Sequence, residues 1–208
     1  AGAVVVSVAY PLTPFPQPVD TGYGVLQWVH RHRTKLGGQG ALVYLAGEEA
    51  GGNLAAAVAL MARDQAHPPL AGQILLSPML DPCVGSASQR RTTGDAVDCK
   101  WVQGWRNFLR CPRDAEHPYA VPASAHRLAG LPPTLVLVGD TDPMRDEALA
   151  YAARLHAAGL QVTQHVFAKA EKWPEPLLET GPHECPCAGA VQEEFRRFFE
   201  ATRCRESS

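Results

Sequence analysis

Short apolar runs alternate with helical patterns along most of this 208-residue chain. The runs are mainly apolar, as strands buried in a parallel sheet are. They lie at residues 4–9, 41–46, 71–78, 134–138 and 162–167. Helical spacing or an alanine-rich composition predicts helices at residues 19–37, 53–63, 147–158 and 190–199. Because crossovers between parallel strands carry helices, this alternation predicts an α/β fold, with a mostly parallel sheet and helices on both faces.

The size of the chain fits a single domain, residues 1–208. Hydrophobic residues make up 46% of it, which is ordinary for a protein with one packed core. Segment 82–121 carries Trp101, Trp105 and Phe108 at helical spacing. Aromatic residues at this spacing are common in cores, but the segment interrupts the strand pattern. We interpret it as an insertion that covers a pocket.

The charge balance argues against two classes of partner. The 19 Lys and Arg residues against 21 Asp and Glu residues leave a formal charge of -2, which gives no general attraction to nucleic acid or anionic lipid. The longest apolar stretches are far shorter than the roughly 20 residues of a membrane span.

The basic group at residues 30–35 is interpreted as a solvated helix end without a function. No signal peptide is recognised, so we expect a cytoplasmic location.

The six cysteines are spread through a chain that is large enough to fold without disulfides. We therefore expect reduced thiols. Residues 183–187, His-Glu-Cys-Pro-Cys, offer a metal three ligands but no fourth. We expect neither a metal site nor a cofactor.

Residues 47–51, Gly-Glu-Glu-Ala-Gly, lie between a predicted strand and a predicted helix. This is the spacing of G-x-S-x-G, the sharp turn that exposes the nucleophile of α/β-hydrolases. With the following Gly-Asn-Leu-Ala, the segment resembles the GDSAGGNLA turn of the hormone-sensitive-lipase-like esterases, the bacterial family IV enzymes. Segments 5–11, 73–81 and 131–147 are also similar to that family, in the same order. The resemblance covers nearly the whole chain and implies an α/β-hydrolase fold acting on carboxylic esters.

Two catalytic positions depart from the family pattern. Glu49 stands where the family has its serine, and it has no hydroxyl to activate. Alignment of the last strand places Lys172 where the histidine should be, so His183 is the candidate substitute. The oxyanion loop, written H-G-G-G in the family, would precede residue 4, and we expect the first strands of the fold to be missing.

The triad acid is assigned to Asp142 by the resemblance. Independently, a carboxylate just past the carboxyl end of a buried parallel strand lies where open α/β folds bind ligands. An equally supported alternative is that Asp142 caps the next helix. The residues around the turn that are expected to contact a ligand are Glu48, Ala50, Gly51, Lys172 and Trp173.

Three functional hypotheses remain open at this stage. In the first, the fold binds an ester-like small molecule without serine-type hydrolysis, and Glu49 pairs with Lys172. In the second, Glu49 is a nucleophile or a base, helped by Asp142 and His183, and repulsion between Glu48 and Glu49 keeps a proton on one of them. In the third, the fold is an interaction scaffold. A homodimer is one expected assembly.

Overall fold

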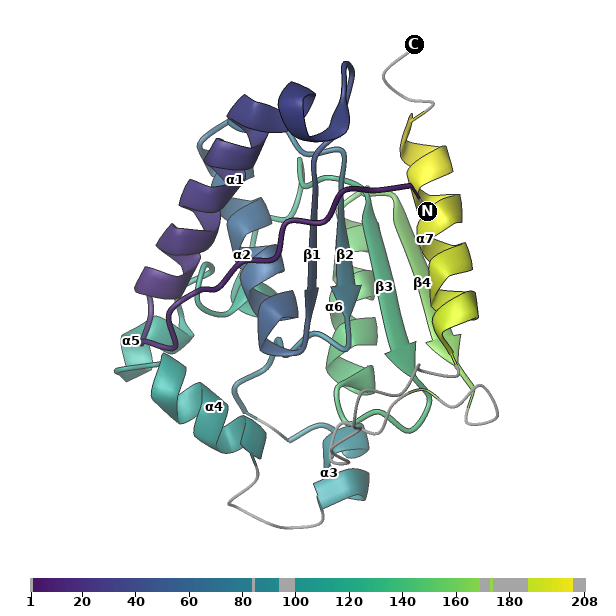
Figure 1. Cartoon of the computed structure of the whole chain (residues 1–208). Coiled ribbons are helices and arrows are strands. Elements are labelled where there is room, and N and C mark those ends of the chain that lie inside the picture. The colour runs from purple at the N-terminus through teal and green to yellow at the C-terminus, as the bar shows by residue number, and fades with distance from the viewer. Residues whose placement is uncertain (1, 84, 94–99, 169–172, 174–186, 204–208) are drawn as a thin grey trace.

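A four-stranded parallel sheet forms the centre of the computed structural model, which describes residues 2–83, 85–93, 100–168, 173 and 187–203. The strands are β1 (Tyr44–Glu48), β2 (Gly72–Leu76), β3 (Thr134–Gly139) and β4 (Val162–Phe167), and they lie side by side in sequence order. Their carboxyl ends point the same way, downward in Figure 1. The predicted parallel sheet is confirmed.

Helices cover both faces of this sheet. The longer ones are α1 (Gln17–Gly37), α2 (Ala50–Asp64), α6 (Arg145–Ala157) and α7 (Ala188–Arg203). Helices α2 and α6 lie on one face and α7 on the other, while α1 packs beside α2 (Figure 1). Gly159 follows α6 with a φ of 82°, the left-handed conformation expected of a glycine that ends a helix.

Alternate residues of each buried strand point to opposite faces of the sheet, as the strand period of two requires. On β2, Leu75 packs with Leu60 of α2 and Leu155 of α6. Its neighbour Ile74 packs with Phe198 of α7. Every residue of β3 is buried, because helices cover both of its sides. This two-sided burial explains why the strand is a continuous apolar run in the sequence.

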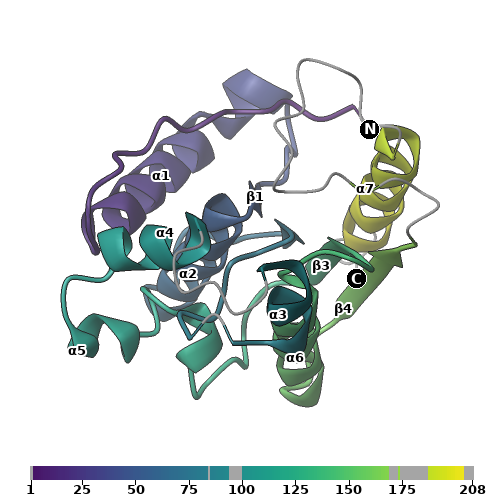
Figure 2. The ribbon, with the colours of Figure 1, turned by 90° about the horizontal axis from the view of Figure 1, so that it is seen from below.

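Short helices lie beyond the carboxyl ends of the strands. They are α3 (Ala87–Thr93), α4 (Lys100–Phe108) and α5 (Pro112–Ala115), and a 3-10 turn, Pro122–Ser124, follows them. Figure 2 views the molecule from this end, with α3 and α4 in front of the sheet. Trp101 and Trp105 of α4 are buried in the core against Phe15 and Val19. Helix α4 is therefore anchored to the core of the domain.

The prediction of a buried strand at residues 4–9 is wrong. The segment forms no strand, and it passes on the side of the sheet that α7 covers (Figure 1 and Figure 2). Val4 and Val5 are 62% and 84% exposed. Strand propensity reflects packing on a sheet surface, and these valines have no neighbouring strand to pair with in the described chain.

Two further expectations concern cysteines and membranes. The expectation of reduced thiols is wrong at Cys187, which is disulfide-bonded, and holds at Cys83 and Cys111. Among the helices of the described residues, none is long and apolar enough to cross a membrane.

Candidate functional site

Glu49 occupies a sharp turn between β1 and α2. Its φ of 46° and ψ of -116° are unusual for a residue with a side chain. Hydrogen bonds fix its backbone on both sides. The Glu49 N–H donates to the carbonyl of Leu76 at 3.1 Å, and its own carbonyl accepts from the N–H groups of Asn53 and Met79 at 3.2 and 3.0 Å. The chain therefore keeps the strained turn of an exposed nucleophile, with a glutamate at its apex.

Two glycines allow this turn to close. A Cβ added to Gly47 would lie 2.0 Å from the carbonyl oxygen of Gly51, and one added to Gly52 would lie 2.9 Å from Pro78. A Cβ at Gly51 would meet nothing within 4 Å. The close backbone packing of the turn thus depends on Gly47 and Gly52. Gly51, the second glycine of the G-x-S-x-G spacing, is not sterically required.

The Glu49 carboxylate faces a cation from α4. Lys100, the first residue of α4, places its Nζ 3.5 Å from Glu49 Oε1. The predicted partner, Lys172, lies outside the described residues. Desolvation, and then the negative charge of Glu49, raise the pKa of Glu48. This direction agrees with the expectation that repulsion within the pair favours a retained proton. Ala50 is exposed at the start of α2 and Gly51 is half-buried.

Asp142 is buried beyond the carboxyl end of β3, where the sequence predicted a ligand-facing acid. Its Oδ2 accepts hydrogen bonds from the Ser77 hydroxyl at 2.5 Å and from Trp173 Nε1 at 3.0 Å. Its Oδ1 accepts the N–H of Met144 at 2.8 Å, just before α6. The helix-capping alternative is thus also satisfied. Burial raises the pKa of Asp142, and the three hydrogen bonds oppose that rise.

Trp173 is held against the strand ends by ring stacking and close contact. Its ring stacks on Phe167, the last residue of β4, with centroids 4.7 Å apart and planes 21° apart. The indole lies so close to Gly139 that a Cβ there would come within 2.6 Å of it. The indole nitrogen is a hydrogen-bond donor only. A hydrogen-bonding position on Asp142 Oδ2 is therefore occupied by a donor that cannot accept a proton.

The structure brings six predicted residues to the carboxyl edge of the sheet: Glu48, Glu49, Ala50, Gly51, Asp142 and Trp173. Glu49 and Asp142 are connected through two adjacent residues. The Glu49 N–H donates to the carbonyl of Leu76, and the hydroxyl of Ser77, which follows Leu76, donates to Asp142. His183 lies outside the described residues, so its predicted role is not tested.

Sequence reasoning missed three residues of this edge: Ser77, Lys100 and Glu147. Ser77 lies inside the strand predicted at residues 71–78, but it directly follows the observed β2 and precedes a proline, which is a recognisable turn signal. Lys100 begins the aromatic helix of the insertion that was expected to cover the pocket. Glu147 lies on the inner side of α6, at a spacing that also fits the apolar residues of that helix.

Glu147 is a buried carboxylic acid behind the site. Its Oε2 accepts the N–H groups of Leu80 and Asp81 at 3.1 and 2.6 Å. Its Oε1 is buried and has no hydrogen-bond partner among the described residues. Burial raises the pKa of Glu147 to about 8, against the effect of these two hydrogen bonds. At neutral pH the group therefore holds a proton in the folded state.

Comparison with known proteins gives consistent matches. The family of the alpha/beta hydrolase fold matches residues 1–171. Esterase LipI of Mycobacterium tuberculosis is 33% identical over 172 residues, 79% of this chain and 53% of that protein. Gibberellin receptor GID1C of Arabidopsis thaliana is 37% identical over 175 residues, 77% of this chain and 50% of the receptor. The chain thus spans about half the length of these relatives.

Solved structures agree with these matches. A bacterial heroin esterase superimposes with a TM-score of 0.73 at 31% identity, over 91% of this chain and 61% of that one. An esterase of Pyrobaculum calidifontis superimposes with a TM-score of 0.77 at 29% identity, over 93% of this chain and 64% of that one.

Proposed function

Since this chain belongs to the alpha/beta hydrolase fold family, in its hormone-sensitive-lipase-like esterase group, we propose that it binds a small ester-like molecule at the Glu49 turn without serine-type hydrolysis. We propose the same class of ligand, a small ester-like molecule, for the whole protein. Binding at the carboxyl edge of a parallel sheet is the general rule for open α/β folds.

The observation that carries the proposal is the hydrogen bond from Trp173 to Asp142. Serine hydrolysis needs a base that takes the hydroxyl proton while an acid orients that base. Here the acid's Oδ2 is bound to an indole N–H and to the hydroxyl of Ser77, and neither can serve as an imidazole base. This arrangement supports a site in which a fixed donor stands where a proton relay would begin.

The residue at the turn leads to the same inference. Glu49 has no hydroxyl, and its carboxylate is paired with Lys100. A carboxylate can attack carbon, but a paired carboxylate is a weaker nucleophile than a free one, because its negative charge is partly neutralised. Glutamate also places its oxygens farther from the backbone than serine does.

The insertion supports a covered binding site. Lys100 contacts Glu49 from α4, whose tryptophans anchor the helix in the core. We propose that segment 82–121 forms one wall of the ligand pocket. A relative named as a gibberellin receptor supports ligand recognition as a role for this fold, beside relatives named as esterases.

The test combines turnover and binding. Wild type, Glu49→Ala and Glu49→Ser are assayed with p-nitrophenyl acetate and butyrate at matched folded concentration. Binding of p-nitrophenyl butyrate is followed by quenching of tryptophan fluorescence. We expect saturable quenching without enzyme-dependent hydrolysis in wild type, and reduced quenching in Trp173→Phe. Trp28→Phe, which changes an exposed tryptophan on α1, is the matched control and should keep the wild-type response.

Two outcomes would overturn the proposal. Wild-type hydrolysis that disappears in Glu49→Ala would make Glu49 a nucleophile or a base. Absence of both hydrolysis and saturable quenching would favour an interaction scaffold.

A further inference from the structure

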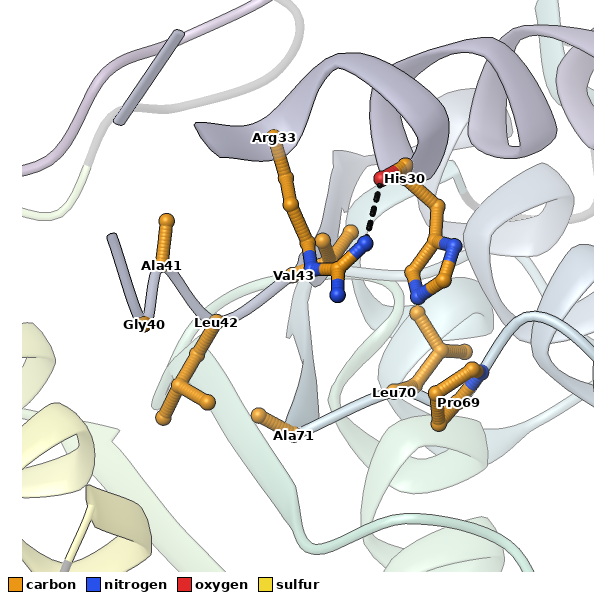
Figure 3. A pocket seen from close by; sticks show the side chains of 9 residues that line it. All are labelled: His30, Arg33, Gly40, Ala41, Leu42, Val43, Pro69, Leu70 and Ala71. Atoms are coloured by element: carbon orange, nitrogen blue, oxygen red, sulfur yellow. Dashed lines mark hydrogen bonds between the residues drawn. The ribbon is translucent and has the colours of Figure 1, made fainter. Parts of the chain in front are cut away.

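A pocket lies at the opposite end of the sheet from Glu49. It is formed by the end of α1 and by the segments that enter β1 and β2, and its volume is about 200 Å³ (Figure 3). Pockets for drug-sized ligands have volumes of roughly 300–1,000 Å³, so this one suits a smaller molecule. It is separated from the Glu49 turn by the length of β1, about 3.3 Å for each of its residues.

The floor of this pocket is apolar and its rim is cationic. Val43, Pro69 and Leu70 form apolar surface, whereas Arg33 and His30 project from α1 on one side (Figure 3). Of the described residues that line the pocket, none is acidic. A ligand with an apolar body and one negative group would match both parts.

Arg33 is held in place by its own helix. Its Nη1 donates to the carbonyl of His30 at 2.9 Å, which uses one of the five N–H donors of the guanidinium. The side chain is exposed, so its other donors can reach a ligand. A carboxylate is the group that a guanidinium binds through two parallel hydrogen bonds.

His30 adds a second polar group beside Arg33. Its ring meets that of His67 edge-on, with centroids 5.0 Å apart. Burial, and then the charges of Arg33 and His67, lower the pKa of His30. The same positive surroundings favour an anion at the rim. A bound anion would reverse this effect on His30.

We propose that this pocket binds a small monocarboxylate with a short aryl or aliphatic body, with the carboxylate on Arg33 and His30 and the body on Val43 and Leu70. The binding site is independent of the Glu49 turn and of the function proposed for it. It also revises the interpretation of residues 30–35 as a helix end without a function.

The test uses benzoate as the probe and benzamide as its neutral match. Affinity is measured by isothermal titration calorimetry at fixed ionic strength, and the imidazole signals of His30 are followed by NMR. We expect benzoate to bind and to raise the pKa of His30, and benzamide to bind at least tenfold more weakly. Arg33→Gln should weaken benzoate binding about tenfold, the loss expected for a charge-assisted hydrogen bond.

Arg31→Gln is the matched control, because Arg31 is an exposed arginine of the same basic segment and does not line the pocket. Its affinity for benzoate should equal that of wild type. Equal losses in both variants would indicate diffuse electrostatic attraction and would overturn the proposal. So would equal affinity for benzamide and benzoate, or His30 signals that do not respond.

Discussion

Trp173 donates its indole N–H to Oδ2 of Asp142 across 3.0 Å, and this bond joins residues 31 positions apart in the chain. It fills one of the acceptor positions that a triad acid would offer to its histidine. The stacking of Trp173 on Phe167 keeps the donor in place. The bond therefore has a structural consequence that can be measured.

We expect Trp173→Phe to lower the free energy of unfolding by about 1–2 kcal/mol at neutral pH, because a buried carboxylate loses a donor while the ring stacking is kept. The pKa of Asp142, already raised by burial, should rise further. Since a raised folded-state pKa makes stability fall as pH rises, the deficit should be smaller in acid. Urea denaturation across pH measures it. Trp28→Phe is the control, and a pH-independent deficit would contradict the assignment.

Alanine substitutions at Gly47 and Gly51 should differ sharply in their effect on stability. Gly47→Ala would force a Cβ to within 2.0 Å of the Gly51 carbonyl oxygen, so we expect a loss of at least about 3 kcal/mol or failure to fold. Gly51→Ala meets no atom within 4 Å and lies in α2, where alanine is the better helix former. It should be neutral or stabilising by up to about 1 kcal/mol. Thermal denaturation compares them, and equal losses would refute this view.

The backbone conformation of Glu49 predicts a difference in stability between its glycine and alanine variants. A residue with a side chain at φ 46° and ψ -116° stores backbone strain of about 1–3 kcal/mol, which glycine does not. Both Glu49→Gly and Glu49→Ala remove the ion pair with Lys100, so their comparison isolates the backbone. We expect Glu49→Gly to be more stable than Glu49→Ala by about 1 kcal/mol. Glu48→Gly, in the regular strand β1, should instead be destabilising. Chemical denaturation distinguishes these outcomes, and an Ala variant as stable as the Gly variant would exclude strain.

Much of the fold could be predicted because its signals are local. The run 134–138 is apolar since helices cover both sides of β3, and Gly159 ends α6 in the conformation that glycine favours. The segment 4–9 shows the limit of such signals. Its valines have strand propensity, but propensity does not provide a hydrogen-bonding neighbour.

The site could be predicted in its backbone more than in its contacts. The spacing of Gly47 and the following residues predicted the turn, and the strand end predicted Asp142. The bonds from Ser77 and Trp173 to Asp142 depend on how separate loops meet, which no local pattern contains. Lys100 was missed for the same reason.

Glu147 predicts a pH dependence of stability. Its pKa is raised from 4.5 in the unfolded chain to about 8 in the fold, mainly by burial. A raised carboxyl pKa contributes stability that is fully present below the unfolded value and is lost as pH rises through the folded value. Stability should therefore decline between about pH 4.5 and 8.

Glu147→Gln keeps the shape of the protonated acid and cannot ionise, and its carbonyl oxygen can accept the N–H groups of Leu80 and Asp81. We expect it to match wild type near pH 4.5 and to exceed it by a few kcal/mol at pH 8, since one pKa unit corresponds to about 1.4 kcal/mol. Urea denaturation at several pH values measures this difference. Glu200→Gln, at an exposed position of α7, is the control and should follow the wild-type curve. If Glu147→Gln declined in parallel with wild type, another group would carry the pH dependence.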